Sequence, residues 1–353
     1  MDVYVMNQQF QTVSIIDAYE SLIWTDRYSG YGDFEIYAPF SLDLLNKVRQ
    51  DYYVTINDSE HIMIIEGLDI ESNAETGNRL RITGRSLESI LDRRIIWQQT
   101  SYTGNLQNAI RNMLYTAFIS PSIADRRVNN FVFEASTDTR ITSLSIEEEH
   151  TGDNIYEVIK ELCDSNYMGY KITLNDSNQF VFKLYMGEDR SYDQIYNPYV
   201  VFSPNYDNII NSNYLDSTEL MKNVTLVAGE DSGQQRVTVV VGSGSGLTRR
   251  ELFTDARDIQ SEKVSNYQEA LRQRGIKHLL ENARTVDFEG EVDATRLFVY
   301  GEDFYMGDVV QISNEYGIEG AARVVEFIRS EDSNGIKQYP TFEAIQNIDT
   351  TVG

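Results

Sequence analysis

Positive charge is scarce in this sequence. Its 353 residues carry 30 Lys and Arg against 55 Asp and Glu, which gives a formal net charge of −25 at pH 7. A protein that binds duplex nucleic acid needs a basic surface to displace counterions from the phosphates, and docking on an anionic membrane surface needs the same sign of charge. The composition therefore argues against stable binding to nucleic acid or to anionic lipid.

Cysteine and histidine are also scarce, with one Cys and three His. Cys163 cannot form an internal disulfide, and its place in the helical spacing of Ile155–Cys163 predicts a buried apolar side chain. His61, His150 and His278 stand apart, and none has another His or Cys at the spacing of metal ligands. The sequence thus predicts no metal site and no bound cofactor.

Long apolar runs are missing as well. No window reaches the roughly 18 apolar residues that a membrane helix requires, and the densest run, Ile62–Ile65, has the length of a strand. Residues 1–17 lack both the basic region and the apolar stretch of a signal peptide. We therefore expect no integral membrane association, and we expect the chain to assemble in the cytoplasm of the cell that makes it.

Motifs that indicate catalysis are absent from the sequence. The run Gly242–Gly246 is typical of a flexible loop, because a dinucleotide fingerprint needs a third glycine where Leu247 stands. The charge run Glu147–His150 is interpreted as a solvated loop, since neighbouring side chains in a row seldom converge on one substrate atom. No nucleophile elbow and no zinc-protease helix occurs. We therefore predict no catalytic residue and no enzyme.

The sequence does have the composition of a folded, strand-rich protein. Hydrophobic residues make up 41%, Tyr alone contributes 23 residues, and Pro only 5, which excludes a disordered chain. Residues 1–98 alternate apolar and polar side chains as strands do. Residues 99–205 instead show helical spacing at Asn105–Phe118 and Ile155–Cys163, followed by a hairpin. Strands return from residue 206 and are interrupted by one long helix at about 265–284.

A weak internal repeat runs through the two strand-rich regions. Each copy has a strand, a turn, a longer strand, a polar turn and a further strand: Asp51–Ile56, Ile64–Leu68 and Leu80–Ile82, then Asp308–Ser313, Val324–Ile328 and Thr341–Glu343. A hairpin beside a strand is common, so chance similarity stays open. If the repeat is real, two copies of one small β-barrel flank an insertion.

These observations predict a mainly β fold with an α+β insertion. We assign residues 1–98 to a first β-barrel domain and residues 99–205 to the inserted α+β domain. Residues 206–353 are assigned to a second barrel that contains the long helix.

Two pairs of adjacent arginines interrupt the acidic composition. They are Arg93-Arg94, before an apolar stretch, and Arg249-Arg250, after the glycine-rich loop. One interpretation is ion pairing with nearby carboxylates at the surface of the same chain. The other is contact with an acidic face of a neighbouring subunit.

Several segments, in order along nearly the whole chain, resemble the siphophage tail-hub family, which is similar to the baseplate hub of contractile-tailed phages. The most specific is Gly84–Trp97, which reads Gly-Arg-Ser-Leu-Glu-Ser-Ile-Leu-Asp-Arg-Arg-Ile-Ile-Trp. The others are Gly30–Pro39, Asn223–Glu230, Gly301–Val310, Arg323–Ile328 and Tyr339–Phe342.

The resemblance implies a structural protein of the virion at the tip of a phage tail. It implies a homotrimer with two tube-type barrels per chain that closes the distal end of the tail tube. The implied partners are the distal tail protein ring, the tail tube, the tape-measure protein, and tip or fibre proteins. Larger relatives carry C-terminal extensions that bind receptors or cut cell wall; the sequence ends shortly after Phe342, so we expect no such activity.

The resemblance and the internal repeat lead to one hypothesis. Two similar barrels in each of three chains form six similar units around one axis, which matches a hexameric tail tube. DNA then passes through the ring without stable binding, and an acidic lumen would keep it from adhering to the wall. The alternative function is a tail-tip protein that binds carbohydrate or degrades cell wall.

Overall fold

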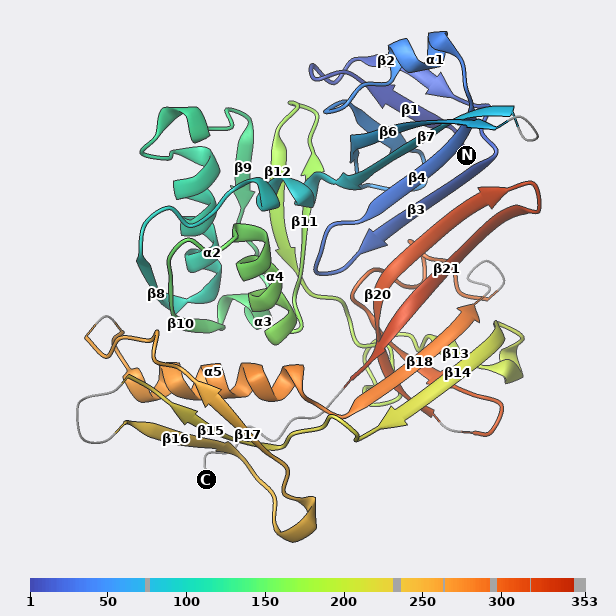
Figure 1. Cartoon of the computed structure of the whole chain (residues 1–353). Helices are drawn as coiled ribbons and strands as arrows, with labels where there is room; N and C mark the ends of the chain where they lie inside the picture. Colours follow the sequence, from blue (N-terminus) through green and yellow to red (C-terminus); the bar gives the residue numbers. More distant parts are fainter. Residues whose placement is uncertain (74–76, 231–235, 263, 293–296, 318, 346–353) are drawn as a thin grey trace.

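The computed structural model describes residues 1–73, 77–230, 236–262, 264–292, 297–317 and 319–345. Figure 1 shows an upper sheet from the N-terminal region, a mixed α/β part beside it, and a lower region that returns to strands. The expected mainly β class with an α+β insertion is confirmed.

The N-terminal region is built almost entirely of strands. Its elements are β1 (Val3–Met6), β2 (Thr12–Ile16), β3 (Ser21–Arg27), β4 (Asp33–Pro39), α1 (Leu42–Lys47), β5 (Tyr53–Ile56), β6 (Met63–Asn73), β7 (Gly77–Ser86) and the 3₁₀ helix η1 (Leu87–Arg93). Buried and partly exposed residues alternate along β4, as expected for a strand with one face on a core.

The insertion mixes short strands and helices. Its elements are β8 (Thr100–Asn105), α2 (Leu106–Leu114), η2 (Tyr115–Ile119), η3 (Ala124–Arg126), β9 (Phe131–Glu134), α3 (Thr139–Thr142), β10 (Ser145–His150), α4 (Ile155–Ser165), β11 (Gly169–Leu174) and β12 (Phe180–Tyr185). The side chain of Asn154 caps α4 by accepting the N–H groups of Tyr156 and Glu157. One apolar core joins these helices to η1 and to the strands below them.

The C-terminal region contains two separate sheets. Its elements are β13 (Val201–Phe202), η4 (Pro204–Tyr206), β14 (Ile209–Ser217), β15 (Val224–Ala228), β16 (Thr238–Gly242), η5 (Gly246–Thr248), β17 (Glu251–Asp255), α5 (Tyr267–Glu281), β18 (Thr285–Val292), β19 (Val309–Ser313), β20 (Glu319–Asp332) and β21 (Gly335–Ala344). The expected long helix is α5, and it packs on the small sheet β16-β15-β17 with a core of its own. We call these four elements the α5 unit.

The remaining strands of both ends join in one 13-stranded mixed sheet. Its main path runs β14-β18-β21-β20-β3-β4-β7-β6-β5-β1-β2, and β19 pairs with β20 and with β13. We call β1–β7 the first half-sheet and β13, β14 and β18–β21 the second half-sheet. No pairing among the described strands closes either half-sheet on itself. The division into three domains stays a prediction.

The internal repeat is present as a repeated strand order. The path β3-β4-β7-β6-β5 in the first half-sheet has its counterpart in β14-β18-β21-β20-β19 in the second. Both long strands carry a bulge at the same place, after Ile65 in β6 and after Val324 in β20. The alignment read from the sequence is off by one residue, since the residue of positive φ before each inner strand is Asp51 in one copy and Gly307 in the other.

Two further details differ from the sequence predictions. The charge run Glu147–His150, interpreted as a solvated loop, belongs to strand β10, where Glu147 is buried. Its carboxylate is held there because it accepts the N–H of Ser265, at 2.6 Å, across the contact with the α5 unit. Cys163 is buried in α4 as predicted, and burial raises the pKa of its thiol.

Candidate functional site

The two half-sheets meet where β20 pairs with β3, and we call this contact the joint. It runs antiparallel from Glu326 opposite Arg27 to Glu331 opposite Leu22. Only the second part of β20 takes part, because its first part, Glu319–Arg323, pairs with β19. Figure 1 shows β20 and β21 rising alongside β3 from the lower region. A single 14-residue strand thus spans both half-sheets.

A buried ion pair lies within the joint. Arg329 Nη1 donates to Asp26 Oδ2 at 2.6 Å, and both residues are about 2% exposed. The same carboxylate accepts the indole N–H of Trp24 at 3.0 Å and the hydroxyl of Ser59 at 3.0 Å. A buried carboxylate with this many donors is satisfied, so the pair fixes the two strands in one register.

Tyr28, immediately after β3, contacts three parts of the chain at once. Its ring lies where a Cβ on either Gly169 or Gly307 would be, 2.2 to 2.3 Å from its Cε2 atom. Its hydroxyl donates to the carbonyl of Tyr167 at 3.0 Å, and the guanidinium of Arg323 lies over its ring at 5.5 Å. Glycines are required at both contacts because no side chain fits between the ring and the backbone.

A second buried network ties the first half-sheet to the insertion. Glu88 in η1 is fully buried and accepts the backbone N–H of Ile172, in β11, at 2.6 Å. His61 Nδ1 lies 3.4 Å from the same carboxylate. Burial alone would lower the pKa of His61, but the charges of Asp26 and Glu88 outweigh it and raise that pKa to about 9.

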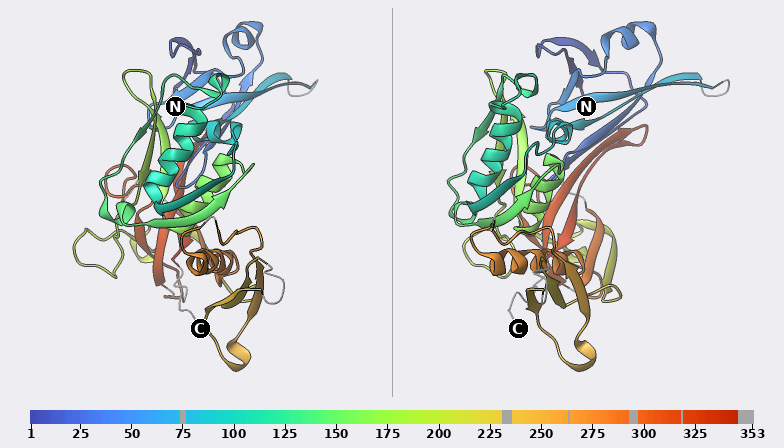
Figure 2. Two further views of the ribbon diagram at one scale, coloured as in Figure 1. Left: turned by 90° about the vertical axis from the view of Figure 1, so that its left-hand side faces the viewer. Right: turned by 60° about the vertical axis from the view of Figure 1, so that its left-hand side comes forward.

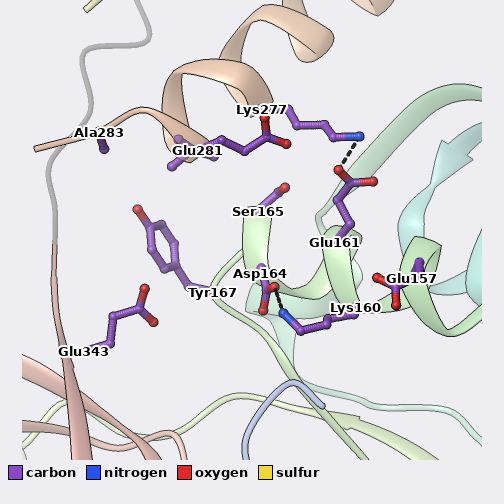
Figure 3. A pocket seen from close by; sticks show the side chains of 11 residues that line it. Glu157, Lys160, Glu161, Asp164, Ser165, Tyr167, Lys277, Glu281, Ala283 and Glu343 are labelled. Carbon is purple, nitrogen blue, oxygen red and sulfur yellow. Dashed lines mark hydrogen bonds and ion pairs between the residues drawn. The ribbon is translucent and has the colours of Figure 1, made fainter. Parts of the chain in front are cut away.

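A hollow with a volume of about 410 Å³ lies between α4, α5 and β21. Figure 3 shows acidic side chains from all three elements facing it. Lys160 pairs with Asp164 at 2.6 Å, and Lys277 pairs with Glu161 across the gap between the two helices. Since the pair of Lys277 and Glu161 holds α5 to α4, the hollow is part of the contact between the insertion and the α5 unit.

The adjacent arginines have partners in their own chain. Arg93 lies 3.3 Å from Asp51, and Arg249 lies 2.6 Å from Glu251. Arg94 stacks over Phe118, and Arg250 donates to the carbonyl of Thr218. Ion pairing within the chain is therefore seen for Arg93 and Arg249, whereas Arg94 and Arg250 contact an aromatic ring and a backbone carbonyl.

The three histidines lie in separate places. His150 contacts Glu148 at 2.8 Å and Asp153 at 2.9 Å, and His278 lies 3.2 Å from Thr254. Across the described residues, no group of three or more His, Cys, Asp or Glu side chains is arranged to hold a metal ion. Nor does any helix in that part of the chain have the length and apolarity to cross a bilayer.

Sequence reasoning missed the joint, and it also missed a further part of the repeat. The tripeptide Asp33-Phe34-Glu35 of β4 recurs as Asp287-Phe288-Glu289 in β18, the matching strand of the second half-sheet. This identity extends the repeat to the outer strands. It could have shown that each half has more strands in common than the three found from sequence.

The fold is shared with solved phage tail proteins. A tail protein from Neisseria meningitidis MC58 superposes with a TM-score of 0.62 at 13% identity, covering 99% of this chain and 97% of that one. The 43 kDa tail protein of prophage MuSo2 from Shewanella oneidensis gives 0.62 at 13%, covering 98% of both chains. Prophage tail protein gp18 from Listeria monocytogenes EGD-e gives 0.60 at 14%, covering 99% and 96%. At such low sequence identity, these comparisons establish a common fold and no common function.

Comparison with curated proteins finds no match. A family model, in contrast, matches almost the full length of the sequence, from residue 2 to residue 342. That span includes both half-sheets, the insertion and the α5 unit. The chain therefore belongs to the family of siphovirus ReqiPepy6 Gp37-like proteins.

Proposed function

We propose that this protein is the hub at the distal end of a siphovirus tail. Three copies form a ring of six similar half-sheets that closes the tail tube and serves as part of the conduit for DNA and the tape-measure protein. The partners are the distal tail protein ring, the tail tube, the tape-measure protein, and tip or fibre proteins. The role is structural, and DNA is in contact with it only in transit.

The observation that carries this proposal is the repeated half-sheet. Each chain holds two sheets with the same strand order, and a tube of sixfold symmetry is matched by three chains only if each chain contributes two such units. Family membership and the tail-protein fold support the same assignment. The buried networks at Asp26 and Glu88 suit a rigid frame, because each of them ties neighbouring parts of the chain together.

Cryo-electron microscopy of the full-length protein, alone and in tails, tests the proposal. We expect three copies per tail around a central opening. The half-sheets should follow approximate sixfold symmetry, while the insertion and the α5 unit should follow threefold symmetry. Any stoichiometry other than three, or a multiple of three, would contradict it. A tail-tip hydrolase would instead lose a measurable activity on cell wall when one or two carboxylates are changed.

A further inference from the structure

At the place where the second half-sheet forms the joint, the first half-sheet has an edge that pairs with no described strand. We call such an edge an open edge. In β20, residues Glu326–Glu331 pair with β3 on the side away from β21. In β6, only Met63 and Ile64 pair with β5 on the corresponding side, and no described strand pairs with Gly67–Ser72 there. Both views of Figure 2 show the hairpin of β6 and β7 reaching out beyond the rest of the sheet.

The second half-sheet has the complementary open edge. Its strand β14 is the counterpart of β3, because each lies next to the Asp-Phe-Glu strand of its own half-sheet. Whereas β3 pairs on both sides, β14 pairs only with β18 among the described strands and lies at the end of the sheet. Each chain therefore offers one open edge of each kind used in the joint.

The pairing registers fix which residues correspond. The bulges align Ile65 with Val324, so Leu68 corresponds to Phe327 and Ile70 to Arg329. Trp24 lies opposite Phe34, and Tyr214 lies opposite Phe288, so β14 is offset from β3 by a constant number of residues. By that offset Thr25 corresponds to Leu215, and Asp26 to Asp216.

Residues at the open edges are more exposed than their counterparts in the joint, as expected if a further strand is needed to cover them. Arg329 is 2% exposed and Thr25 is 5% exposed in the joint. Their counterparts Ile70 and Leu215 are each 47% exposed, although both are large and apolar. Apolar side chains on an open strand edge invite pairing with another chain unless they are covered.

Backbone groups at the open edge are also set for pairing. In the joint, the carbonyl of Val325 accepts the N–H of Tyr28 at 2.9 Å. The carbonyl of Glu66, its counterpart, accepts instead from the side chain of Gln50 at 3.1 Å. Because alternate residues of a strand direct their amides to the same side, the N–H groups of Leu68 and Ile70 face the open edge.

We infer that β6 of one copy pairs antiparallel with β14 of a second copy, in the register of the joint. Gly67 then lies opposite Ser217 of the partner subunit, Leu68 opposite the partner's Asp216, and Asp69 opposite the partner's Leu215. The occupant of each open edge is thus a second copy of this chain. The contact is head-to-tail, and it alternates with the joint around a ring. The number of copies in this inference rests on the proposed function. The register between β6 and the partner's β14 is taken from the joint alone.

Disulfide cross-linking of the full-length protein tests the register. Asp69 and the partner's Leu215 form a non-hydrogen-bonded pair, in which Cα atoms lie ~4.5 Å apart, within the range that a disulfide spans. We expect Asp69→Cys combined with Leu215→Cys to give, on oxidation, a covalent species of three chains. The control pairs Asp69→Cys with Ser217→Cys, two residues out of register, and should cross-link at least tenfold less. Cys163 is fully buried and does not interfere.

The possible outcomes separate this inference from the proposed function. A trimer in which the matched pair fails to cross-link, or cross-links no better than the control, overturns the register while leaving the hub role standing. Cross-linked chains that close at a number other than three overturn the hub role while supporting the strand pairing. A protein that stays a single chain at every concentration, and in tails, overturns both.

A proline at the open edge tests the same contact by a different route. Proline is tolerated on an edge strand where its missing N–H faces solvent. We expect Ile70→Pro to leave the single chain folded, with an unchanged circular dichroism spectrum, and to weaken trimer formation at least tenfold. Ile70→Val keeps both the amide and an apolar side chain and should assemble like the parent. If Ile70→Pro assembles as well as Ile70→Val, the pairing is wrong.

Discussion

Asp26 and Arg329 show how strongly single residues bind the two half-sheets together. The two are separated by most of the sequence, yet they form an ion pair at 2.6 Å with almost no exposure to water. Removing one member of a buried pair leaves the other charge without compensation, which costs more than the pair itself contributes.

We expect Asp26→Asn to lower the free energy of unfolding by about 3–5 kcal/mol. The matched control is Glu326→Gln, which removes the ion pair with Arg27 in the same joint. That pair is roughly one third exposed on both sides, so its loss should cost less than ~1 kcal/mol. Chemical denaturation of the three proteins measures the difference. If both variants lose the same free energy of unfolding, burial of the Asp26 pair does not add to its effect on stability.

His61 is expected to make stability depend on pH. The neighbouring carboxylates of Asp26, Glu88 and Glu60 raise its pKa from 6.5 to about 9, against the effect of burial. A pKa that is higher in the folded state adds stability that is fully present below pH 6.5 and is lost as the pH rises through about 9.

The measurement is the free energy of unfolding from pH 6 to pH 10, for the parent and for His61→Asn. The parent should lose ~3 kcal/mol more than the variant over this range, following the size of the pKa difference. The difference between the two proteins is the relevant quantity, because the pKa of His150 is also raised, by Glu148 and Asp153 against the effect of burial. If the free energy of unfolding changes with pH in the same way in both proteins, the prediction is wrong.

At the scale of elements, α5 depends on a glycine in the middle of a helix. A Cβ on Gly275 would lie 2.7 Å from Val227 and 2.8 Å from Val241, so the helix can approach its sheet only without a side chain there. The close contact compensates for the low helix propensity of glycine.

We therefore expect Gly275→Ala to destabilise the α5 unit by about 1–3 kcal/mol through overpacking, although alanine favours helix formation. The control is Gly320→Ala in β20, where a Cβ meets no atom within 4 Å, and this change should leave stability the same or higher. Hydrogen exchange of the amides of α5 and β15 reads out the effect locally. Faster exchange in the control than in Gly275→Ala would refute the packing argument.

Local elements could be predicted from the sequence because their signals are local. The helix at Ile155–Cys163 has a capping residue and an apolar spacing within one short stretch, and it is found there as α4. The hairpin of β11 and β12 has strand-forming residues on both sides of a polar turn. In each case the residues that determine the structure are neighbours in the chain.

Long-range contacts could not be predicted in the same way. Nothing in Leu22–Arg27 indicates that the partner of β3 is β20, because strand pairing depends on backbone groups that every sequence has. In the same way, β17 is stabilised by its parallel pairing with β15, a strand that lies more than twenty residues earlier in the chain. The repeat indicates that the two ends of the chain have similar strands, but it does not indicate that they pair with each other.

At the scale of the whole molecule, the net charge of −25 is consistent with the proposed role, in which DNA passes without binding. Carboxylates repel phosphates, so a lumen with more Asp and Glu than Lys and Arg keeps the wall free of DNA. Many arginines of the first half-sheet are already paired, as Arg81 is with Glu35 and Arg85 with Glu66. Paired cations offer little attraction to a passing phosphate.

We expect the proposed ring to show no measurable affinity for duplex DNA, even at low ionic strength, where electrostatic attraction is strongest. Titration of a labelled duplex from 20 to 200 mM salt, followed by fluorescence anisotropy, checks this. A reconstruction of the ring should also show an excess of acidic side chains on the channel wall. If the channel wall is neutral or basic, repulsion of DNA does not explain the net negative charge of the protein.

The 14-residue length of β20 has a mechanical consequence. Because one strand belongs to both half-sheets, a pull along the strand direction loads the hydrogen bonds of the joint together, in shear, and not one after another. Bonds that must break at the same moment resist far more force than bonds that can be peeled open in turn. In the proposed hub, a tail tip that is strained on meeting a cell would therefore transmit the load through its chains and deform first at weaker contacts outside the joint.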